Sequence, residues 1–227
     1  MLILAIDTAL GAVAACIYDR SENRVLASER LFIDRGHAEA VIPLIERMST
    51  RTQGELSAVA RVAVTIGPGS FTGIRVGVAA AKAIGTGLGV DVVGVSTLSA
   101  FAAPLLGRQG LNVGCVIDAR HGNVYFECFD PNGSVVHEAA ILPVKEAAAR
   151  LGDTPSLLTG PGAALVAIEA WSQGKKVEVA GESASPAIEF VAKLGAMAEI
   201  AESPAQPFYL KPADVTPKPL NLVQAKP

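Results

Sequence analysis

The alternation of hydrophobic and polar positions predicts strands in the first part of the chain and an amphipathic helix after them. The helix is predicted at 37–49, where apolar residues recur at spacings of three and four and so share one buried face. These apolar residues are Val41, Leu44, Ile45 and Met48. The preceding strands are predicted at residues 2–7, 12–18 and 25–33.

A glycine-rich turn, GPG, separates the next predicted strand, 61–66, from a predicted helix at 72–88. Ser70 or Thr72 is expected to cap this helix. Such a turn exposes backbone N–H groups at the positive end of a helix, which is how many proteins bind phosphate. The Walker spacing is missing, however, because Lys82 lies well inside the helix. The turn is therefore either an anion site or a simple connection.

The second half of the chain repeats the order of elements found at the start. After a strand at 91–95, a new unit begins near Asn112 with two strands around a turn at His121 and Gly122, which suggests an internal duplication. The later elements are predicted as strands at 113–118, 123–129 and 156–159, a helix ending at Trp171 and a helix at 186–202. The proline-rich tail is expected to be extended. We therefore divide the chain into a first lobe, a second lobe, a helix with a return segment on the first lobe, and a tail: 1–107, 108–185, 186–212 and 213–227.

The helix at 72–88 is apolar on every side and carries a strip of small residues, which are Gly73, Gly77, Ala81 and Gly85. The interior glycines together cost about 1.5–3 kcal/mol relative to alanine, so close packing of another backbone along the strip is the simplest compensation. That backbone belongs either to the chain's own sheet or to a helix of a partner protein. In the second case the helix at 37–49 forms the other wall of the contact.

Composition restricts the function. The chain has 227 residues, of which 50% are hydrophobic and 18% charged, with a net charge of -3 at pH 7. It can bury a large core, and it has no excess of positive charge for binding nucleic acid on its own. No apolar run indicates a membrane span, and Asp7 interrupts an opening segment that lacks the basic leader of a signal peptide. Cys16, Cys115 and Cys128 are not in CxxC spacing, so we expect buried, reduced thiols in a cytoplasmic protein.

Five motifs occur along the chain in this order: AIDTA, GPGSFTGIRVG, GVSTL, DARHGNVY and PFYLKP. Together they resemble the TsaB family, also called YeaZ, from Ile3 to about Lys211. The resemblance implies an α/β fold of the actin-like, sugar-kinase-like ATPase type, with two related lobes and a reduced second lobe. It also implies a non-catalytic subunit of bacterial tRNA N6-threonylcarbamoyladenosine (t6A) synthesis. Such a subunit binds and stabilises the catalytic subunit TsaD and works in an assembly with the ATPase TsaE.

The resemblance also indicates metal chemistry that this chain lacks. TsaD carries two metal-binding histidines four residues apart, and the matching segment here, GVSTLSAF, has Thr97 and Phe101 at those positions. Neither is a good metal ligand. The third TsaD ligand is an aspartate, and none occurs near Ser185 and Pro186. We therefore expect no metal site and no catalytic residue. The histidines lack metal-binding spacing and are expected at the surface: His37, His121 and His137.

Several residues match the phosphate and adenosine motifs of the fold that the resemblance implies. In an active member, an aspartate at such a position would hold a hydrated magnesium ion near the nucleotide phosphates. Turns and strand ends require the same residue types without a nucleotide, so no cofactor is expected, and nucleotide binding at a subunit interface stays an alternative. The matching residues are Asp7, Gly67, Gly69, Asp118, Gly122, Gly160 and Gly162.

The leading functional hypothesis is a scaffold that binds TsaD through the helices 37–49 and 72–88 and does not itself transfer the carbamoyl group. The alternatives are an ATP-dependent phosphotransferase of the sugar-kinase type and a metalloprotease, which needs an HExxH-like pair that the sequence does not offer. Without its partner, the chain is expected to form a homodimer through the same helices. The expected interface residues are His37, Val41, Leu44, Ile45, Met48, Gly73, Gly77, Ala81, Lys82 and Gly85.

Overall fold

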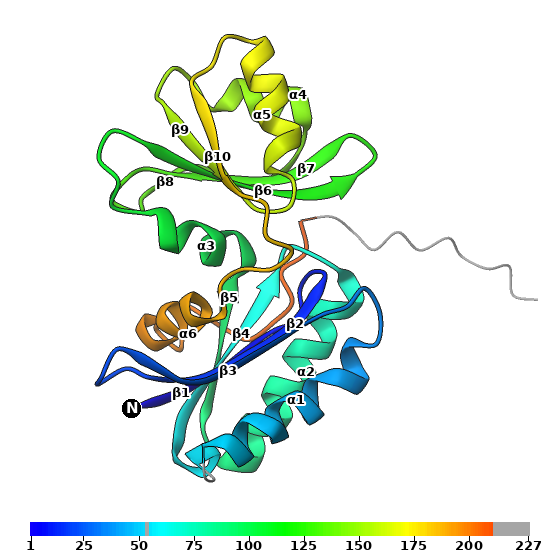
Figure 1. Ribbon diagram of the computed structural model, residues 1–227, viewed down its shortest axis with the longest axis vertical. Helices are drawn as coiled ribbons and strands as arrows, with labels where there is room; N and C mark the ends of the chain where they lie inside the picture. The colour runs from blue at the N-terminus through cyan, green and yellow to red at the C-terminus, as the bar shows by residue number, and fades with distance from the viewer. Residues whose placement is uncertain (53–54, 211–227) are drawn as a thin grey trace, which may run out of the picture.

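The computed structural model describes residues 1–52 and 55–210, which form two stacked lobes (Figure 1). The first lobe contains β1 (Leu2–Asp7), β2 (Ala12–Asp19), β3 (Arg24–Phe32), α1 (His37–Arg51), η1 (Glu55–Ala58), β4 (Val59–Gly67), α2 (Phe71–Leu88), β5 (Asp91–Ser96), α3 (Thr97–Ala102) and η2 (Ala103–Leu105). The second lobe contains β6 (Asn112–Arg120), β7 (Asn123–Phe129), β8 (Val135–Pro143), α4 (Val144–Arg150), β9 (Ser156–Thr159), α5 (Ala163–Ser172) and β10 (Val177–Gly181). The chain then returns to the first lobe with α6 (Ile188–Met197).

The two lobes share one strand order. Among the described residues, the first sheet runs β3-β2-β1-β4-β5 and the second runs β8-β7-β6-β9-β10. In the first sheet β1 pairs antiparallel with β2 and parallel with β4. In the second sheet β6 pairs in the same way with β7 and β9. This repeated topology confirms the duplication and the two-lobed α/β fold that the sequence predicts.

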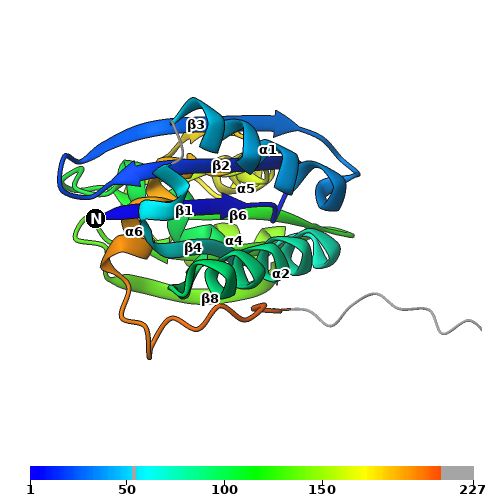
Figure 2. The ribbon, with the colours of Figure 1, turned by 90° about the horizontal axis from the view of Figure 1, so that it is seen from below.

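Helices cover both faces of the first sheet (Figures 1 and 2). On one face α1 and α2 bury a cluster that includes Leu44, Met48 and Ile74. On the other face α6 packs against side chains that include Ile3 and Val93. In the second lobe α4 and α5 pack on one face of the sheet, and the opposite face packs on α3 between the lobes.

The glycine strip of α2 lies inside the first lobe, against the chain's own sheet. A Cβ atom at Gly73 would overlap the carbonyl oxygen of Thr8, and one at Gly77 would overlap Thr8 Oγ1. The Thr8 hydroxyl also donates a hydrogen bond to the carbonyl of Gly73 at 2.7 Å. Gly85 faces the side chain of Val92 with equally little space. The assignment of this strip to a partner protein is therefore wrong, because internal close packing already offsets the cost of the glycines.

Several elements differ from the prediction. The helix predicted at 186–202 ends at Met197, where Arg61 Nη1 donates to the carbonyls of Gly195 at 3.0 Å and Ala198 at 2.9 Å and so satisfies the end of the helix. The short elements α3, β8, α4 and β10 are additions to the sequence prediction. The tail predicted at 213–227 lies outside the described residues.

Two expectations from composition concern thiols and membranes. All three cysteines are buried and free of disulfide bonds, as predicted. Burial raises the pKa of Cys16 to about 12 and that of Cys128 to about 11, so both thiols stay protonated at neutral pH. Within the part of the chain that the structure describes, no helix combines the length and apolar character needed to span a membrane.

Candidate functional site

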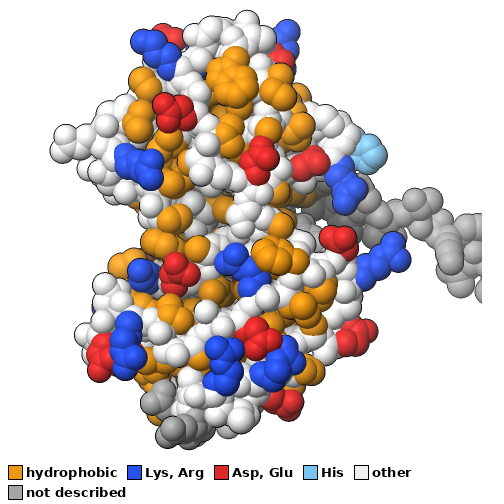
Figure 3. Space-filling view, in the orientation of Figure 1, with side chains coloured by type: hydrophobic (Ala, Val, Ile, Leu, Met, Phe, Trp, Pro, Cys, Tyr) orange, Lys and Arg blue, Asp and Glu red, His pale blue; other side chains and the backbone are white. Residues whose placement is uncertain are grey.

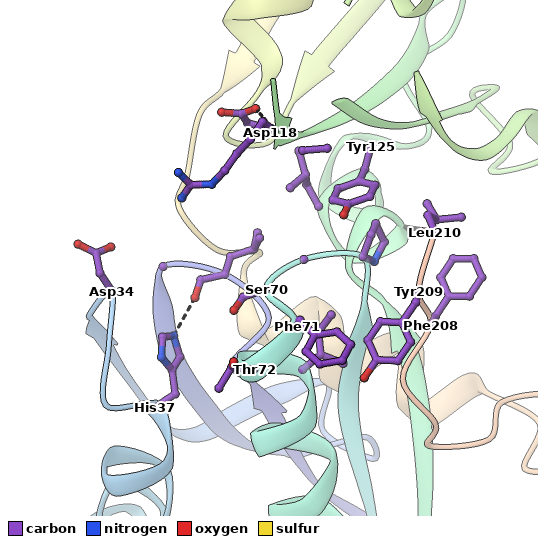
Figure 4. Close-up of a pocket in the computed structure, with 18 of the residues that line it drawn as sticks. Asp34, His37, Ser70, Phe71, Thr72, Asp118, Tyr125, Phe208, Tyr209 and Leu210 are labelled. Atoms are coloured by element: carbon purple, nitrogen blue, oxygen red, sulfur yellow. Dashed lines mark hydrogen bonds between the residues drawn. The ribbon is translucent and has the colours of Figure 1, made fainter. Parts of the chain in front are cut away.

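A cleft of about 920 Å³ lies between the two lobes (Figure 4). The first lobe lines it with the turns after β1 and β4 and with the start of α1, and the second lobe lines it with the end of β6 and with Tyr125. The return segment closes one side with Phe208, Tyr209 and Leu210. Clefts at the carboxyl ends of parallel strands are common ligand sites in α/β proteins, so this is the candidate binding site of the chain.

The glycine-rich turn forms one wall of the cleft and leads into α2. Ser70 caps the helix, because its Oγ accepts a hydrogen bond from the Gly73 amide at 3.2 Å. The Ser70 amide donates to the carbonyl of Ala9 at 2.7 Å, and a Cβ at Gly69 would overlap that same carbonyl. The shape of the turn is therefore explained by its contact with the segment after β1, which favours its role as a connection.

An aromatic cluster holds the return segment beside the cleft (Figure 4). The Arg75 guanidinium lies 3.7 Å from the centre of the Phe71 ring, and its Nε donates to the hydroxyl of Tyr209 at 2.9 Å. The rings of Phe71 and Tyr209 are 4.9 Å apart. The amide of Phe208 donates to the carbonyl of Ile66 at 2.8 Å. These contacts tie the return segment to α2 and β4.

Charged side chains of both signs line the cleft. Asp34 and Arg35 come from the loop before α1, and Asp118 and Arg120 come from the end of β6. Asp118 accepts a hydrogen bond from the amide of Arg120 at 2.7 Å, which shapes the turn between β6 and β7. With the aromatic rings, these groups suit a ligand that has both polar and planar parts. Asp118 was predicted from the sequence as a candidate site residue, whereas Asp34, Arg35 and Arg120 were not.

Of the seven residues that match nucleotide motifs, Gly69 and Asp118 line the cleft. Asp7 instead is fully buried, and its Oδ1 accepts hydrogen bonds from Thr65 Oγ1 at 2.6 Å and from the Ala9 amide at 3.1 Å. Burial raises the pKa of Asp7 above its ordinary value, against the opposing effect of these hydrogen bonds. Asp7 thus fixes the end of β1 and the turn after it.

The remaining glycines of that set serve packing and turns. Gly160 has a φ of +97°, and a Cβ there would overlap the carbonyl of Val116. A Cβ at Gly162 would lie 2.9 Å from the Val116 side chain, and one at Gly67 would lie 2.6 Å from the backbone of the return segment. Gly122 lies in the turn between β6 and β7. Close approach of backbone therefore explains most of these residues without a nucleotide.

Most of the predicted interface residues are inside the first lobe. Val41, Leu44, Ile45, Met48, Gly73, Gly77, Ala81 and Gly85 are buried by the packing of α1 and α2 on the sheet. The prediction that they contact a partner is therefore wrong, because a buried side chain is not available to another protein. Lys82 is exposed, and His37 is half-buried with its Nε2 donating to the carbonyl of Leu10 at 2.9 Å. The outward sides of the two helices carry Ile42, Ala79 and Ala83 instead.

The positions that the resemblance relates to metal ligands lie in hydrophobic surroundings. Thr97 is fully buried and Phe101 is 4% exposed, and Phe101 packs with Leu98 against β6 and β7. Ser185, near the third position, is also fully buried. In residues 1–52 and 55–210, no three His, Cys, Asp or Glu side chains are grouped to hold a metal ion. A threonine hydroxyl is a poor metal ligand, and a phenylalanine ring is not a ligand for such metals.

The side chain of Glu127 is a buried carboxyl group on the side of the second sheet that packs toward the first lobe, and it was not predicted from the sequence. Glu127 lies directly opposite Cys115 in the sheet and on the same side of β7 as Phe129. Its side chain is 7% exposed, and its Oε2 has no hydrogen-bond partner among the described residues. Burial, with a smaller contribution from the charge of Glu138, raises the pKa of Glu127 to about 7.

Two α/β lobes with the same strand order and a cleft between them define a protein of the actin-like ATPase fold. Residues 31–200 match the family model described as TsaD: tRNA N6-adenosine threonylcarbamoyltransferase. This match covers well over half of the sequence, and the chain belongs to this family.

Relatives within this group carry the names TsaB and YeaZ. The chain is 35% identical over 136 residues to the tRNA threonylcarbamoyladenosine biosynthesis protein TsaB of Escherichia coli (strain K12), covering 59% of this chain and 58% of that protein. A protein of the same name from Bacillus subtilis (strain 168) is 30% identical over 125 residues, or 55% of this chain and 53% of that protein. The chain thus spans little more than half the length of these relatives. The structure of YeaZ from Pseudomonas aeruginosa matches with a TM-score of 0.73 and 26% identity, over 92% of this chain and 99% of that one. These matches confirm the TsaB/YeaZ resemblance.

Proposed function

We propose that the chain is a non-catalytic subunit of t6A biosynthesis that binds and stabilises a catalytic TsaD protein. The family match and the names of the relatives support a role in this tRNA modification. The observation that supports the non-catalytic part is the burial of Thr97 and Phe101, the residues that the family resemblance aligns with metal-binding histidines of TsaD. A chain with these residues has lost the means to hold that metal and acts through its surfaces.

The outward sides of α1 and α2 are the surface proposed for TsaD. Ala79, Lys82 and Ala83 are exposed on α2, and Ile42 is 42% exposed on α1. Small side chains allow the backbone of a partner helix to approach closely, and Lys82 offers a positive charge at the edge. The proposed contact therefore uses the same two helices that the sequence predicted, but through their exposed residues instead of their buried ones.

To test this surface, an affinity-tagged version of the chain is purified, and the TsaD protein of the same organism that co-purifies with it is measured. The substitution Ala83→Arg puts a long charged side chain on the proposed surface and is expected to abolish the co-purification of TsaD. The matched control is Ala149→Arg, at an exposed alanine of α4 in the second lobe. We also expect t6A in tRNA to fall on depletion of the chain and to be restored by Ala149→Arg but not by Ala83→Arg. Equal recovery of TsaD by both variants would refute this surface.

The second candidate is an ATP-dependent phosphotransferase, and the observation that favours it is the cleft lined by Gly69, Asp118 and Arg120. The burial of Asp7 argues against it, because a magnesium-binding aspartate must reach the nucleotide. Calorimetry with Mg-ATP distinguishes the two functions. Binding in the micromolar range by the chain alone, lost on Asp118→Ala, would favour the phosphotransferase. TsaE as a further partner in the assembly and a cytoplasmic location both belong to the proposed function.

A further inference from the structure

The entrance of the cleft carries opposite charges on both lobes. Asp34 and Arg35 come from the loop between β3 and α1 in the first lobe, and Asp118 and Arg120 come from the end of β6 in the second lobe. All four residues are exposed. Figure 3 shows acidic and basic side chains on both sides of the waist between the lobes, at the right of the view. Each lobe therefore presents one negative and one positive charge to the other.

The charges of the two lobes lie apart across the cleft. Within residues 1–52 and 55–210, none of these four side chains forms an ion pair. Figure 4 shows Asp34 extending from the first lobe toward the second, on the side of the cleft where Asp118 lies. The backbone of Arg120 is fixed next to Asp118, because its amide donates to that carboxylate at 2.7 Å. A narrower cleft on this side therefore brings unlike charges together, which lowers the electrostatic energy.

The turn that carries Arg120 has an unusual backbone. Arg120 has a φ of +64° and His121 has a φ of +53°. This left-handed conformation is uncommon for residues with a Cβ atom, and tight hairpin turns favour asparagine, aspartate or glycine there. The turn therefore keeps an arginine at a position where its backbone is not favoured. This supports a role for the Arg120 side chain beyond forming the turn.

The connections between the lobes allow them to rotate. One connection, residues 106–111, contains Gly107 and Gly110, both with positive φ and with open space where a Cβ would lie. The other is residues 182–187, between β10 and α6. The lobes also meet through the apolar packing of α3 on the second sheet. In Figure 1 α3 lies at the left of the waist and the loop before α1 lies at the right, so a rotation about α3 narrows the cleft where the charges are.

We propose that Asp34 and Arg120 form an ion pair across the cleft that holds the two lobes in a closed position. Arg35 and Asp118 form a second pair of the opposite sense. Exposed ion pairs are weak, and each one shifts the ratio of closed to open molecules by about two- to five-fold. The lobes therefore exchange between both positions, and closing narrows the entrance for a ligand. The inference does not depend on the proposed function, because the ion pairs form within one chain.

The experiment measures the distance between the lobes in the full chain, with one spin label on each lobe. The natural thiols are buried, so Glu46→Cys on α1 and Ser172→Cys on α5 supply the two exposed thiols for labelling. At low salt, double electron–electron resonance is expected to show a short and a long distance. Because salt screens exposed charges, about 1 M NaCl is expected to lower the ratio of short to long distances by at least about two-fold.

Charge reversal identifies the residues that form the pair. Arg120→Glu places a second negative charge opposite Asp34 and is expected to lower the ratio of short to long distances by at least about two-fold. Asp34→Arg is expected to do the same, and the double variant Asp34→Arg/Arg120→Glu is expected to restore the ratio. The control Lys176→Glu makes the same change in net charge at an exposed position of the second lobe outside the cleft, and we expect it to keep the parent ratio.

Three outcomes would overturn the proposal. The first is a parent chain with a single distance that does not respond to salt. The second is a double variant that stays as open as Arg120→Glu alone. The third is an equal effect of Lys176→Glu and Arg120→Glu, which would assign the change to net charge. An unchanged circular dichroism spectrum shows that each variant is folded, and the double variant tests the pair even where a single variant is unstable. None of these measurements requires TsaD, so failure of the ion pair and failure of the proposed function are distinguishable.

Discussion

The substitution Glu127→Gln tests how a buried carboxyl group between the lobes affects the pH dependence of stability. In the parent protein this carboxyl is buried against an apolar cluster, and burial raises its pKa to about 7. The unfolded chain releases the proton near the ordinary value of 4.5. Between these two values the folded state keeps a proton that the unfolded state has lost. The free energy of unfolding therefore falls as the pH rises toward 7, and the contribution of this group is constant above that.

The size of the effect follows from the two pKa values. One pH unit corresponds to about 1.4 kcal/mol, so the ionised carboxyl destabilises the folded protein by roughly 3 kcal/mol above pH 7. Glutamine stays neutral at every pH and removes this dependence. We therefore expect the free energy of unfolding of Glu127→Gln, relative to the parent, to increase by roughly 3 kcal/mol between pH 4.5 and pH 8.

Urea denaturation followed by circular dichroism, at one protein concentration, measures this difference across the pH range. Glu178→Gln, at an exposed glutamate of β10, is the matched control and is expected to follow the parent at every pH. Glu138→Gln removes the negative charge that is the second cause of the raised pKa of Glu127. We expect this variant to lower the midpoint of the pH dependence only slightly, because burial, the larger cause, is unchanged. Parallel stability profiles for Glu127→Gln and the parent would refute the reasoning, because they would mean that the carboxyl is solvated in the folded protein.

Two further predictions concern α2. Gly77→Ala is expected to destabilise the fold by roughly 1–3 kcal/mol, because the added Cβ overlaps Thr8 Oγ1, whereas Gly87→Ala on the open side of the helix is expected to stabilise it by about 0.5–1 kcal/mol. Urea denaturation measures both, and equal effects would contradict the packing described for the glycine strip. Arg75→Ala is expected to raise hydrogen exchange at the Phe208 amide about two- to five-fold, since it removes a contact of about 0.5–1 kcal/mol, while the exposed Lys82→Ala leaves that amide unchanged. Unchanged exchange in Arg75→Ala would show that the return segment is held by its backbone alone.

Much of the fold could be predicted because its main elements have strong periodic patterns. The first two strands, β1 and β2, are near-continuous apolar runs, and α1 carries its buried residues at regular helical spacing. The missed elements are short or ambiguous. The helix α4 has seven residues, and β8 mixes exposed and half-buried positions, with Leu142 as its one buried residue. Such segments become ordered through the tertiary packing around them, which a local pattern does not contain.

The candidate site was predicted less completely, for a physical reason. Helical periodicity identified the buried side of α1 and the strip on α2, but periodicity does not say whether the covering surface belongs to the same chain. Here it is the chain's own sheet, through Thr8 and its neighbours. The cleft also depends on residues far apart in sequence, such as Arg35, Tyr125 and Tyr209, which the fold brings together. The return segment closes one side of the cleft, and the sequence signal for it was the aromatic pair Phe208 and Tyr209 in the PFYLKP motif.

The path of the chain between the lobes has a consequence for synthesis on the ribosome. The second sheet and its helices occupy one continuous stretch, from β6 to β10, so this lobe can complete its core as soon as that stretch has emerged. The first sheet cannot, because α6 covers one of its faces and leaves the ribosome after the entire second lobe. A nascent chain interrupted before Ile188 would therefore carry a finished second lobe and a first lobe with an open apolar face, which is the form that chaperones are expected to recognise.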